Sequence, residues 1–238
     1  MIQSQPPIPD PVIRRLPRYL THVREMKKAR EVWVSSADLA GALGLTTSTV
    51  RQDISHLDVT GVPKRGYRVA ELERVLGAVL GASAVHRVVI VGAGLLGRAL
   101  ALHAELADNG FEVCAIFDNA KSTIGRKVGP LKVQPVGNLD RIVRDLRVDI
   151  GVIAVPSAAA QLVANQLVEA GVRGLLNLAH AHLHVPRGVH IVEGRLLARM
   201  QQLAYAVRAS RTPRSAAPSS NGSPGERRML PGQASSAK

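Results

Sequence analysis

The chain has 238 residues, of which 46% are hydrophobic and 21% are charged, and its formal net charge is +13. This length suits one large domain or two small ones, and the composition is that of a soluble globular protein. Cys114 is the only cysteine, which excludes an intrachain disulfide and any multi-cysteine zinc site. No apolar run approaches the roughly 18 residues of a membrane helix, and the N-terminus lacks a signal-peptide pattern, so we expect a cytoplasmic protein without a membrane partner.

The positive charge is spread along the whole chain. Residues 1–80 carry 12 Lys and Arg against 8 Asp and Glu, residues 81–205 carry 13 against 9, and residues 206–238 carry 6 against 1. A basic excess in every part is compatible with a polyanionic partner such as DNA. A genome that favours arginine codons is the alternative explanation.

The first predicted element is an amphipathic helix that follows Pro11 and ends near Arg30. Its apolar positions recur with a period near 3.6 and are Ile13, Leu16, Leu20, Val23 and Met26. Pro17 lies inside this pattern, so it bends the first turn or marks a later start of the helix.

Two short helices are predicted next, in "VSSADLAGALGLTTSTVRQDISHLDVTG". Ser35 or Ser36 can cap the first helix, whose end is marked by Gly44 in the left-handed conformation. Thr46 or Thr47 can cap the second. The inward positions of the two helices are apolar: Leu39, Ala40, Leu43, Val50, Ile54 and Leu57. This arrangement is that of a helix-turn-helix.

The outward positions of the second helix carry the chemistry of DNA recognition. They are Ser48, Thr49, Arg51, Gln52, Ser55 and His56. Arg reads guanine, Gln reads adenine, and hydroxyl groups reach phosphates or base edges. Downstream, "GVPKRGYRV" predicts a β-hairpin wing whose cations, Lys64, Arg65 and Arg68, would lie along a phosphate backbone. An ordinary helical hairpin with a solvated polar face is the alternative.

We therefore interpret residues 10–80 as a winged helix-turn-helix domain that contacts DNA. The predicted DNA-contacting residues are Ser48, Thr49, Arg51, Gln52, Ser55, Lys64 and Arg65.

Residues 84–193 alternate apolar strands with helical patterns, which indicates a Rossmann-like parallel sheet. Gly92, Gly94 and Gly97 have the spacing G-x-G-x-x-G between the strand "RVVIVG" and a helix expected from about Leu96 to Asn109. The first glycine permits a tight turn, the second lets a pyrophosphate approach the backbone, and the third packs the helix against the strand. The free N–H groups and the helix dipole favour phosphates.

The next strand, "EVCAIF", leads to Asp118, which lies 21 residues beyond Gly97. A carboxylate at this place accepts the ribose hydroxyls of a dinucleotide and favours NAD(H) over NADP(H), although Lys121 lies nearby. A later strand, Ile150 to Val155, ends before Pro156 at the sheet edge where ligands sit in open α/β folds.

The predicted dinucleotide contacts are Gly92, Ala93, Gly94, Leu95, Leu96, Gly97, Asp118 and Pro156. A set of glycines that only packs helix against strand is the alternative.

The sequence contains no recognisable catalytic constellation. A nicotinamide dehydrogenase needs a proton donor or acceptor near the hydride. The only candidates of note are His180, His182 and His184 in "AHAHLH", which we interpret as a polar turn, because no acidic partner for a zinc site accompanies them. We therefore expect no catalytic residue and no metal ligand.

The C-terminal part divides in two. We expect a helix over 194–208, followed by a disordered basic tail over 209–238 that is rich in Ser, Pro, Gly and Arg.

Taken together, the chain resembles the Rex family of redox-sensing transcriptional repressors from about Ile8 to Tyr205. The resemblance rests on "RLPRYL", "SSADLAGALGLTTSTVRQDIS", "RGYRV", "VGAGLLGRAL", "GFEVCAIFD", "VPSAAAQLVANQLVEAGVRGLLN" and "MQQLAY". It implies a homodimer that exchanges its C-terminal helices and binds an inverted-repeat operator. It further implies that NADH releases the dimer from DNA whereas NAD+ permits binding, through a population shift.

Several positions depart from the family pattern. Pro63 and Lys64 replace an Arg-Gly pair in the wing, Gln52 replaces a lysine, and Leu95 replaces an asparagine. The resemblance also implies a state-dependent contact among a tyrosine, an aspartate and an arginine.

In this chain His103 takes the place of that tyrosine and Arg195 the place of the aspartate, facing Arg15, so that two arginines would repel. Glu193 could substitute if the helix start were shifted. A DNA-binding paralogue with an altered or lost NADH response is therefore one alternative, and a small NAD-linked oxidoreductase is another.

Overall fold

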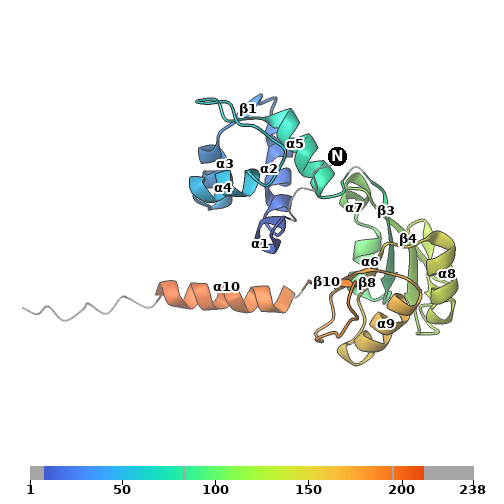
Figure 1. Ribbon diagram of the computed structural model, residues 1–238. Helices are drawn as coiled ribbons and strands as arrows, with labels where there is room; N and C mark the ends of the chain where they lie inside the picture. Colours follow the sequence, from blue (N-terminus) through green and yellow to red (C-terminus); the bar gives the residue numbers. More distant parts are fainter. Residues whose placement is uncertain (1–7, 83, 195, 212–238) are drawn as a thin grey trace, which may run out of the picture. The chain divides into compact units, whose positions relative to one another are not determined.

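The computed structural model describes residues 8–82, 84–194 and 196–211 (Figure 1). The chain divides into a unit of residues 1–195 and a second unit that begins at Leu196. The first unit holds two groups of elements, one within residues 10–79 and one within residues 86–193. The predicted domain boundary at residues 80–84 falls between them and stays a prediction.

The N-terminal group consists of five helices and a small two-stranded sheet within the described residues. The helices are α1 (Asp10–Ile13), α2 (Leu16–Lys28), α3 (Ser36–Leu43), α4 (Thr47–Ile54) and α5 (Val69–Val79). The strands are β1 (Trp33–Val34) and β2 (Tyr67–Arg68), which pair antiparallel.

The single helix predicted after Pro11 is two helices in the structure, α1 and α2. The chain leaves the helical hydrogen-bonding pattern at Arg14 and Arg15, and Pro17 lies in the first turn of α2. Proline suits that turn because its missing N–H would have no partner there. Of the two alternatives for Pro17, the later helix start is the one observed.

The ends of α3 and α4 are set by local side chains, as predicted. The Ser35 hydroxyl accepts the N–H of Asp38 at 3.1 Å, and the Asp38 carboxylate accepts the N–H of Ser35 at 3.0 Å. Gly44 ends α3 with a φ of 65°, in the left-handed region. The Thr46 hydroxyl accepts the N–H of Thr49 at 3.1 Å and begins α4. These capping bonds satisfy backbone groups that have no partner inside the helix.

The apolar residues predicted to face inward are buried in one cluster with side chains of α2 and α5. The fully or largely buried members include Leu16, Tyr19, Val23, Leu39, Ala40, Val50, Ile54, Leu57, Leu72 and Leu76. This cluster fixes α3 and α4 on the helices that flank them.

The second group is built on a six-stranded sheet whose paired strands all run parallel, in the order β10-β9-β8-β3-β4-β7. The strands are β3 (His86–Val91), β4 (Phe111–Asp118), β7 (Gln134–Pro135), β8 (Ile150–Ile153), β9 (Gly174–Asn177) and β10 (His190–Glu193). Numbered along the chain, this is the strand order of the classic dinucleotide-binding fold. The chain crosses from one half of the sheet to the other between β7 and β8, so the switch point lies between β3 and β8.

The helices of this group are α6 (Leu95–Ala101), α7 (Ala104–Asp108), α8 (Leu139–Leu146) and α9 (Ser157–Glu169). A short antiparallel hairpin, β5 (Lys127–Val128) with β6 (Leu131–Lys132), follows β4. A turn of 3₁₀-helix, Val136–Asn138, precedes α8.

The prediction of one continuous helix from Leu96 to Asn109 is wrong. The structure has two helices there, α6 from Leu95 to Ala101 and α7 from Ala104 to Asp108. The extended backbone of His103, with φ −79° and ψ 104°, breaks the run of helical hydrogen bonds. His103 is exposed there and precedes α7.

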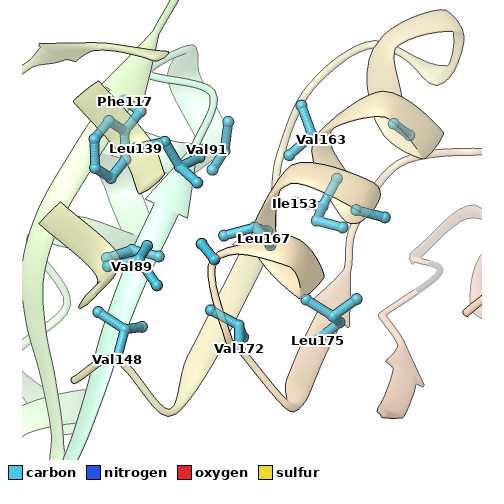
Figure 2. Packing of buried hydrophobic residues seen from close by; sticks show 14 of the residues in the cluster. Val89, Val91, Phe117, Leu139, Val148, Ile153, Val163, Leu167, Val172 and Leu175 are labelled. Carbon is cyan, nitrogen blue, oxygen red and sulfur yellow. The ribbon is translucent and has the colours of Figure 1, made fainter. Parts of the chain in front are cut away.

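The sheet is apolar on both faces, because alternate residues of a strand point to opposite sides. Val89 and Val91 of β3 lie in the cluster shown in Figure 2, where Val163 and Leu167 of α9 point toward the strands. Val88 and Ile90 lie in a second cluster on the opposite face. Burial on both faces is typical of parallel sheets in α/β proteins.

The second unit contains α10 (Leu196–Arg211). The C-terminal helix was predicted over 194–208; in the described residues it runs from Leu196 past Arg208, and Glu193 still belongs to β10. The predicted tail beyond Arg211 and the residue Arg195 lie outside the described residues.

Among the described residues, no helix combines the length and the apolar character needed to cross a membrane.

Candidate functional site

Helix α4 presents to solvent most of the residues predicted to contact DNA. Ser48, Arg51, Gln52 and Ser55 are exposed. Thr49 is half-buried, and its hydroxyl lies 2.8 Å from that of Thr46. Thr49 is therefore partly a capping residue, whereas the other four side chains are exposed, with the Ser55 hydroxyl donating to the carbonyl of Gln52 at 2.7 Å. Arg51 is steadied by a hydrogen bond from its Nε to the Ser36 hydroxyl at 3.2 Å.

A buried network, which the sequence reasoning missed, holds α4 against α2. Asp53 is 1% exposed and accepts two hydrogen bonds from Arg15, from Nε and Nη2, each at 2.6 Å. The Tyr19 hydroxyl donates to the same carboxylate at 2.9 Å. The sequence held one indication of this network. Asp53 lies on the inward face of α4, where burial of a carboxylate without a partner would raise the free energy of the folded state.

This network changes the ionisation of its members. Burial, followed by the hydrogen bond to Asp53, raises the pKa of Tyr19 well above its ordinary value of 10.0, so the phenol is neutral. The hydrogen bond to Asp53 raises the pKa of Arg15 further above its usual range. Arg15 thus has a carboxylate partner on the same chain, in a two-bond geometry that favours strong pairing.

Two other residues named for the switch that the resemblance implies, His103 and Glu193, lie in the second group of elements. His103 lies in the break between α6 and α7. Glu193 ends β10, where its carboxylate accepts a hydrogen bond from the Asn177 side chain at 2.9 Å. Arg195 lies outside the described residues.

The segment that the sequence predicts to be a wing forms a tight hairpin. Val62 and Gly66 pair antiparallel, and the turn between them holds Pro63, Lys64 and Arg65. Lys64 adopts a φ of 64°, in the left-handed region that costs a non-glycine residue conformational energy. A Cβ on Gly66 would lie 2.2 Å from the carbonyl oxygen of Val34, so the hairpin packs closely against β1.

The glycine-rich loop has the backbone that each predicted role requires. Gly92 has a φ of 107°, and a Cβ there would lie 2.3 Å from the carbonyl oxygen of Ala154. A Cβ on Gly97 would lie 1.8 Å from the carbonyl oxygen of Gly92, so only glycine lets α6 approach the strand this closely. A Cβ on Gly94 would meet no atom within 4 Å. The space beside Gly94 is open.

Asp118 is tied to this loop. One carboxylate oxygen accepts the N–H of Ala93 at 2.8 Å, and the other accepts the N–H of Ala120 at 2.8 Å. The carboxylate is half-buried and has lone pairs left for further donors. It therefore fixes the shape of the loop and faces the same space.

A cavity of about 360 Å³ lies at the switch point between β3 and β8. Its lining includes four predicted residues: Gly92, Gly94, Asp118 and Pro156. Residues that were not predicted also line it, notably Asn119, Val155, Leu162 and Gln166. Cavities at this point are the usual ligand sites of open α/β sheets.

The other four predicted contacts lie outside the lining of the cavity. Ala93 and Gly97 are buried and support the loop, whereas Leu95 and Leu96 are exposed at the start of α6. Leu95 is 83% exposed.

The histidines of "AHAHLH" lie in the irregular segment after β9. The rings of His182 and His184 are edge to face, with centroids 5.3 Å apart. In the part of the chain that the structure describes, no group of three or more His, Cys, Asp or Glu side chains is arranged to hold a metal ion.

Comparison with protein families matches two models. Residues 7–55 match a family described as "Putative DNA-binding protein N-terminus", and residues 84–181 match one described as "CoA binding domain". The first match covers α1 to α4, and the second covers the glycine loop and the strands β3, β4, β7, β8 and β9.

Comparison with curated and solved proteins finds relatives over most of the chain. The redox-sensing transcriptional repressor Rex of Carboxydothermus hydrogenoformans is 37% identical over 201 residues, which cover 84% of this chain and 97% of that protein. The crystal structure of RSP in complex with β-NAD+ and operator DNA aligns with a TM-score of 0.81 and 31% identity, over 86% of this chain and 94% of RSP. RSP in complex with β-NADH aligns with a TM-score of 0.78 and 30% identity, over 85% and 95% of the two chains.

Proposed function

Because the chain belongs to the Rex family of redox-sensing transcriptional repressors, we propose that it binds operator DNA as a homodimer and is released by NADH. The observation that carries the proposal is that the same chain has a cavity at the switch point of the sheet and an exposed helix, α4, with the side chains expected of a recognition helix. Its curated relatives are named as transcriptional repressors, and the protein is a DNA-binding regulator rather than an enzyme. Its place of action is then the cytoplasm, with the DNA.

The residues at the cavity fit a dinucleotide. The open side of Gly94 leaves room for a pyrophosphate against the backbone, at the N-terminal end of α6. Asp118 can accept the hydroxyls of the adenosine ribose, which favours NAD(H) because a 2′-phosphate would be repelled. Pro156 and Leu162 supply apolar surface on the other side. The bound dinucleotide would act through its shape and charge, which differ between NADH and NAD+, and it would undergo no reaction in this site.

The DNA-binding surface combines α4 with the wing. Arg51 and Gln52 are the side chains suited to base edges in a major groove. Ser48 and Ser55 are suited to phosphates or base edges, and Lys64 and Arg65 to the flanking backbone. Thr49 contributes through the cap of α4 rather than as a free hydroxyl.

The exposed apolar surface supports a second copy of the chain as the partner. On α10 the exposed apolar side chains are Leu196, Leu197, Met200, Leu203, Tyr205 and Val207. On the sheet a hollow of about 430 Å³, lined mostly by apolar side chains, lies over Val88, Ile90, Val152 and Val192. Surfaces of this kind are typical of interfaces, and two copies related by a two-fold axis match an inverted-repeat operator.

The switch is a coupling between the two sites. NADH can release the dimer only if it binds more tightly to a domain arrangement that does not fit DNA. By the same linkage, operator DNA must weaken the binding of NADH by the same factor.

A DNA-binding member of the family with an altered NADH response is the second candidate. The observation in its favour is that Arg15 is held by Asp53, a residue that is not part of the contact implied by the resemblance. A different contact would then have to transmit the dinucleotide state.

Fluorescence anisotropy tests both candidates. The probe is a labelled duplex that the wild-type protein selects from a random-sequence pool, titrated with NADH and separately with NAD+. We expect release by micromolar NADH and retention with NAD+. Binding that is indifferent to both nucleotides supports the second candidate, and failure to bind any duplex overturns both.

A further inference from the structure

Trp33, in β1, contacts two arginines of the wing. The guanidinium carbon of Arg65 lies 5.6 Å from the centre of the indole ring, and that of Arg68 lies 5.3 Å from it. Both distances are within the range in which a cation is attracted to the electron-rich face of an aromatic ring, and Trp is the strongest such ring.

The backbone around this cluster is held in place on both sides. Trp33 pairs with Arg68 across the β1–β2 ladder, and Gly66 packs against Val34 at a distance that excludes a side chain. Directly after β1, the capping box of Ser35 begins α3. The positions of the ring and of the two arginine backbones are therefore set by folding.

Neither arginine has an ionic partner among the described residues. The ion pairs of the N-terminal helices involve other cations: Arg14 pairs with Asp10, Arg15 with Asp53, and Arg24 and Lys27 with Glu73. Arg65 and Arg68 are both exposed, and they share a ring instead of a carboxylate. Two cations held near each other without an anion attract one from solution.

Contact with a ring face also leaves the donors of an arginine available. The N–H groups of a guanidinium lie in its plane, so a group that approaches along the edge can still accept them when the face is covered. Phosphate oxygens match this fork of donors. The ring therefore limits the rotamers of the two side chains without using the atoms that bind an anion.

We propose that Trp33 is a positioning residue that holds Arg65 and Arg68 as a two-cation clamp for backbone phosphates of the bound DNA. This inference rests on the proposed function, since it assigns a further residue to the same DNA-binding surface. Ordering the two side chains on folding reduces the entropy that would be lost on binding.

A double-mutant cycle tests the clamp. Trp33→Leu keeps apolar bulk in β1 but removes the ring face, and Arg65→Gln with Arg68→Gln removes the two charges. We expect Trp33→Leu to weaken duplex binding about three- to tenfold, given the strength of exposed cation–π contacts. The loss should be equal for the selected duplex and for a scrambled one, because phosphate contacts position the protein and do not read sequence.

The double glutamine variant should lower the slope of log K against log salt by about 1.8, for two phosphate contacts. In that background Trp33→Leu should have no further effect, since the ring would have no cation to hold. Trp33→Phe, which keeps a weaker ring face, should recover part of the affinity. Equal losses from Trp33→Leu with and without the two arginines would overturn the clamp.

Trp33 is the only tryptophan of the chain, so its emission reports on this site alone. We expect the emission to change when saturating duplex binds, and this response should be lost with the double glutamine variant. If the Trp33 emission does not change at saturating duplex, the clamp is overturned while the proposed function stands. A wild-type protein that binds no duplex at all would instead overturn the proposed function.

Discussion

The backbone N–H of Ala93 donates a 2.8 Å hydrogen bond to the carboxylate of Asp118, which joins the glycine loop after β3 to the end of β4. The two residues are far apart in sequence but adjacent at the carboxyl edge of the sheet, since β3 and β4 pair in parallel up to Val91 and Phe117. Asp118 thereby has two roles, in shaping the loop and in facing the ribose of the proposed ligand.

Asp118→Ser should lower the affinity for NADH about tenfold and reduce the preference for NADH over NADPH. The carboxylate is the group that accepts ribose hydroxyls and repels a 2′-phosphate. Titration of the intrinsic fluorescence of each reduced dinucleotide measures both effects. An unchanged ratio of the two dissociation constants would show that Asp118 acts only on the loop.

Gly94→Ala and Gly97→Ala should separate ligand binding from folding. A Cβ on Gly97 would meet the carbonyl oxygen of Gly92, so this variant should lose about 3 kcal/mol or more of stability. A Cβ on Gly94 would project into open space, so that variant should fold within about 1 kcal/mol of the wild type. It should nevertheless bind NADH at least about tenfold more weakly, because the pyrophosphate could no longer approach the backbone.

Urea unfolding and NADH titration on the same samples check this pair. Gly137→Ala is the control, since a Cβ there also meets nothing within 4 Å and the residue lies outside the lining of the cavity. Full NADH affinity in Gly94→Ala would contradict the proposed path of the pyrophosphate.

Lys64→Gly should stabilise the fold and weaken DNA binding at the same time. The φ of 64° suits glycine, so the unfolding free energy should rise by about 0.5–1 kcal/mol. Loss of the cation at the wing tip should lower the salt slope of duplex binding by about 0.9.

Arg147→Gly is the matched control for that variant. Arg147 also has a left-handed backbone, with a φ of 50°, but it lies at the end of α8. The Arg147→Gly variant should gain a similar free energy of unfolding, with no change in its affinity for the duplex. An unchanged slope in Lys64→Gly would remove this lysine from the DNA-contacting set.

Stability should fall above pH 10 because of Tyr19. Its pKa is raised in the folded protein, so the folded state keeps the phenol proton while the unfolded state loses it near its ordinary value of 10.0. The stabilisation is therefore fully present below pH 10 and declines as the pH rises above it, by up to about 1.4 kcal/mol per pH unit.

Tyr19→Phe should remove this component of the pH dependence. The variant should be about 1 kcal/mol less stable at neutral pH, because the hydrogen bond to Asp53 is lost. Urea unfolding of both proteins below and above pH 10 gives the difference, in which the ionisation of other groups cancels. Identical pH slopes would contradict the assignment to Tyr19.

The sequence by itself was sufficient to predict the features that depend on residues close to one another along the chain. Ser35, Gly44 and Thr46 mark helix ends because capping uses the backbone of the same few residues. The strand, glycine loop and helix around Gly92 follow from one continuous stretch, and so does the tight turn of the wing. Family membership likewise followed from motifs in their order along the chain.

The tertiary structure decided the features that join distant residues. Asp53 became a structural partner of Arg15 and Tyr19 rather than a surface charge, and Trp33 met the two arginines of the wing. The break between α6 and α7 at His103 was not predicted from the spacing of apolar residues, and no local sequence feature accounts for it. A side chain's partner depends on which faces the packed helices and strands bring together, and that choice is made by burial across the whole fold.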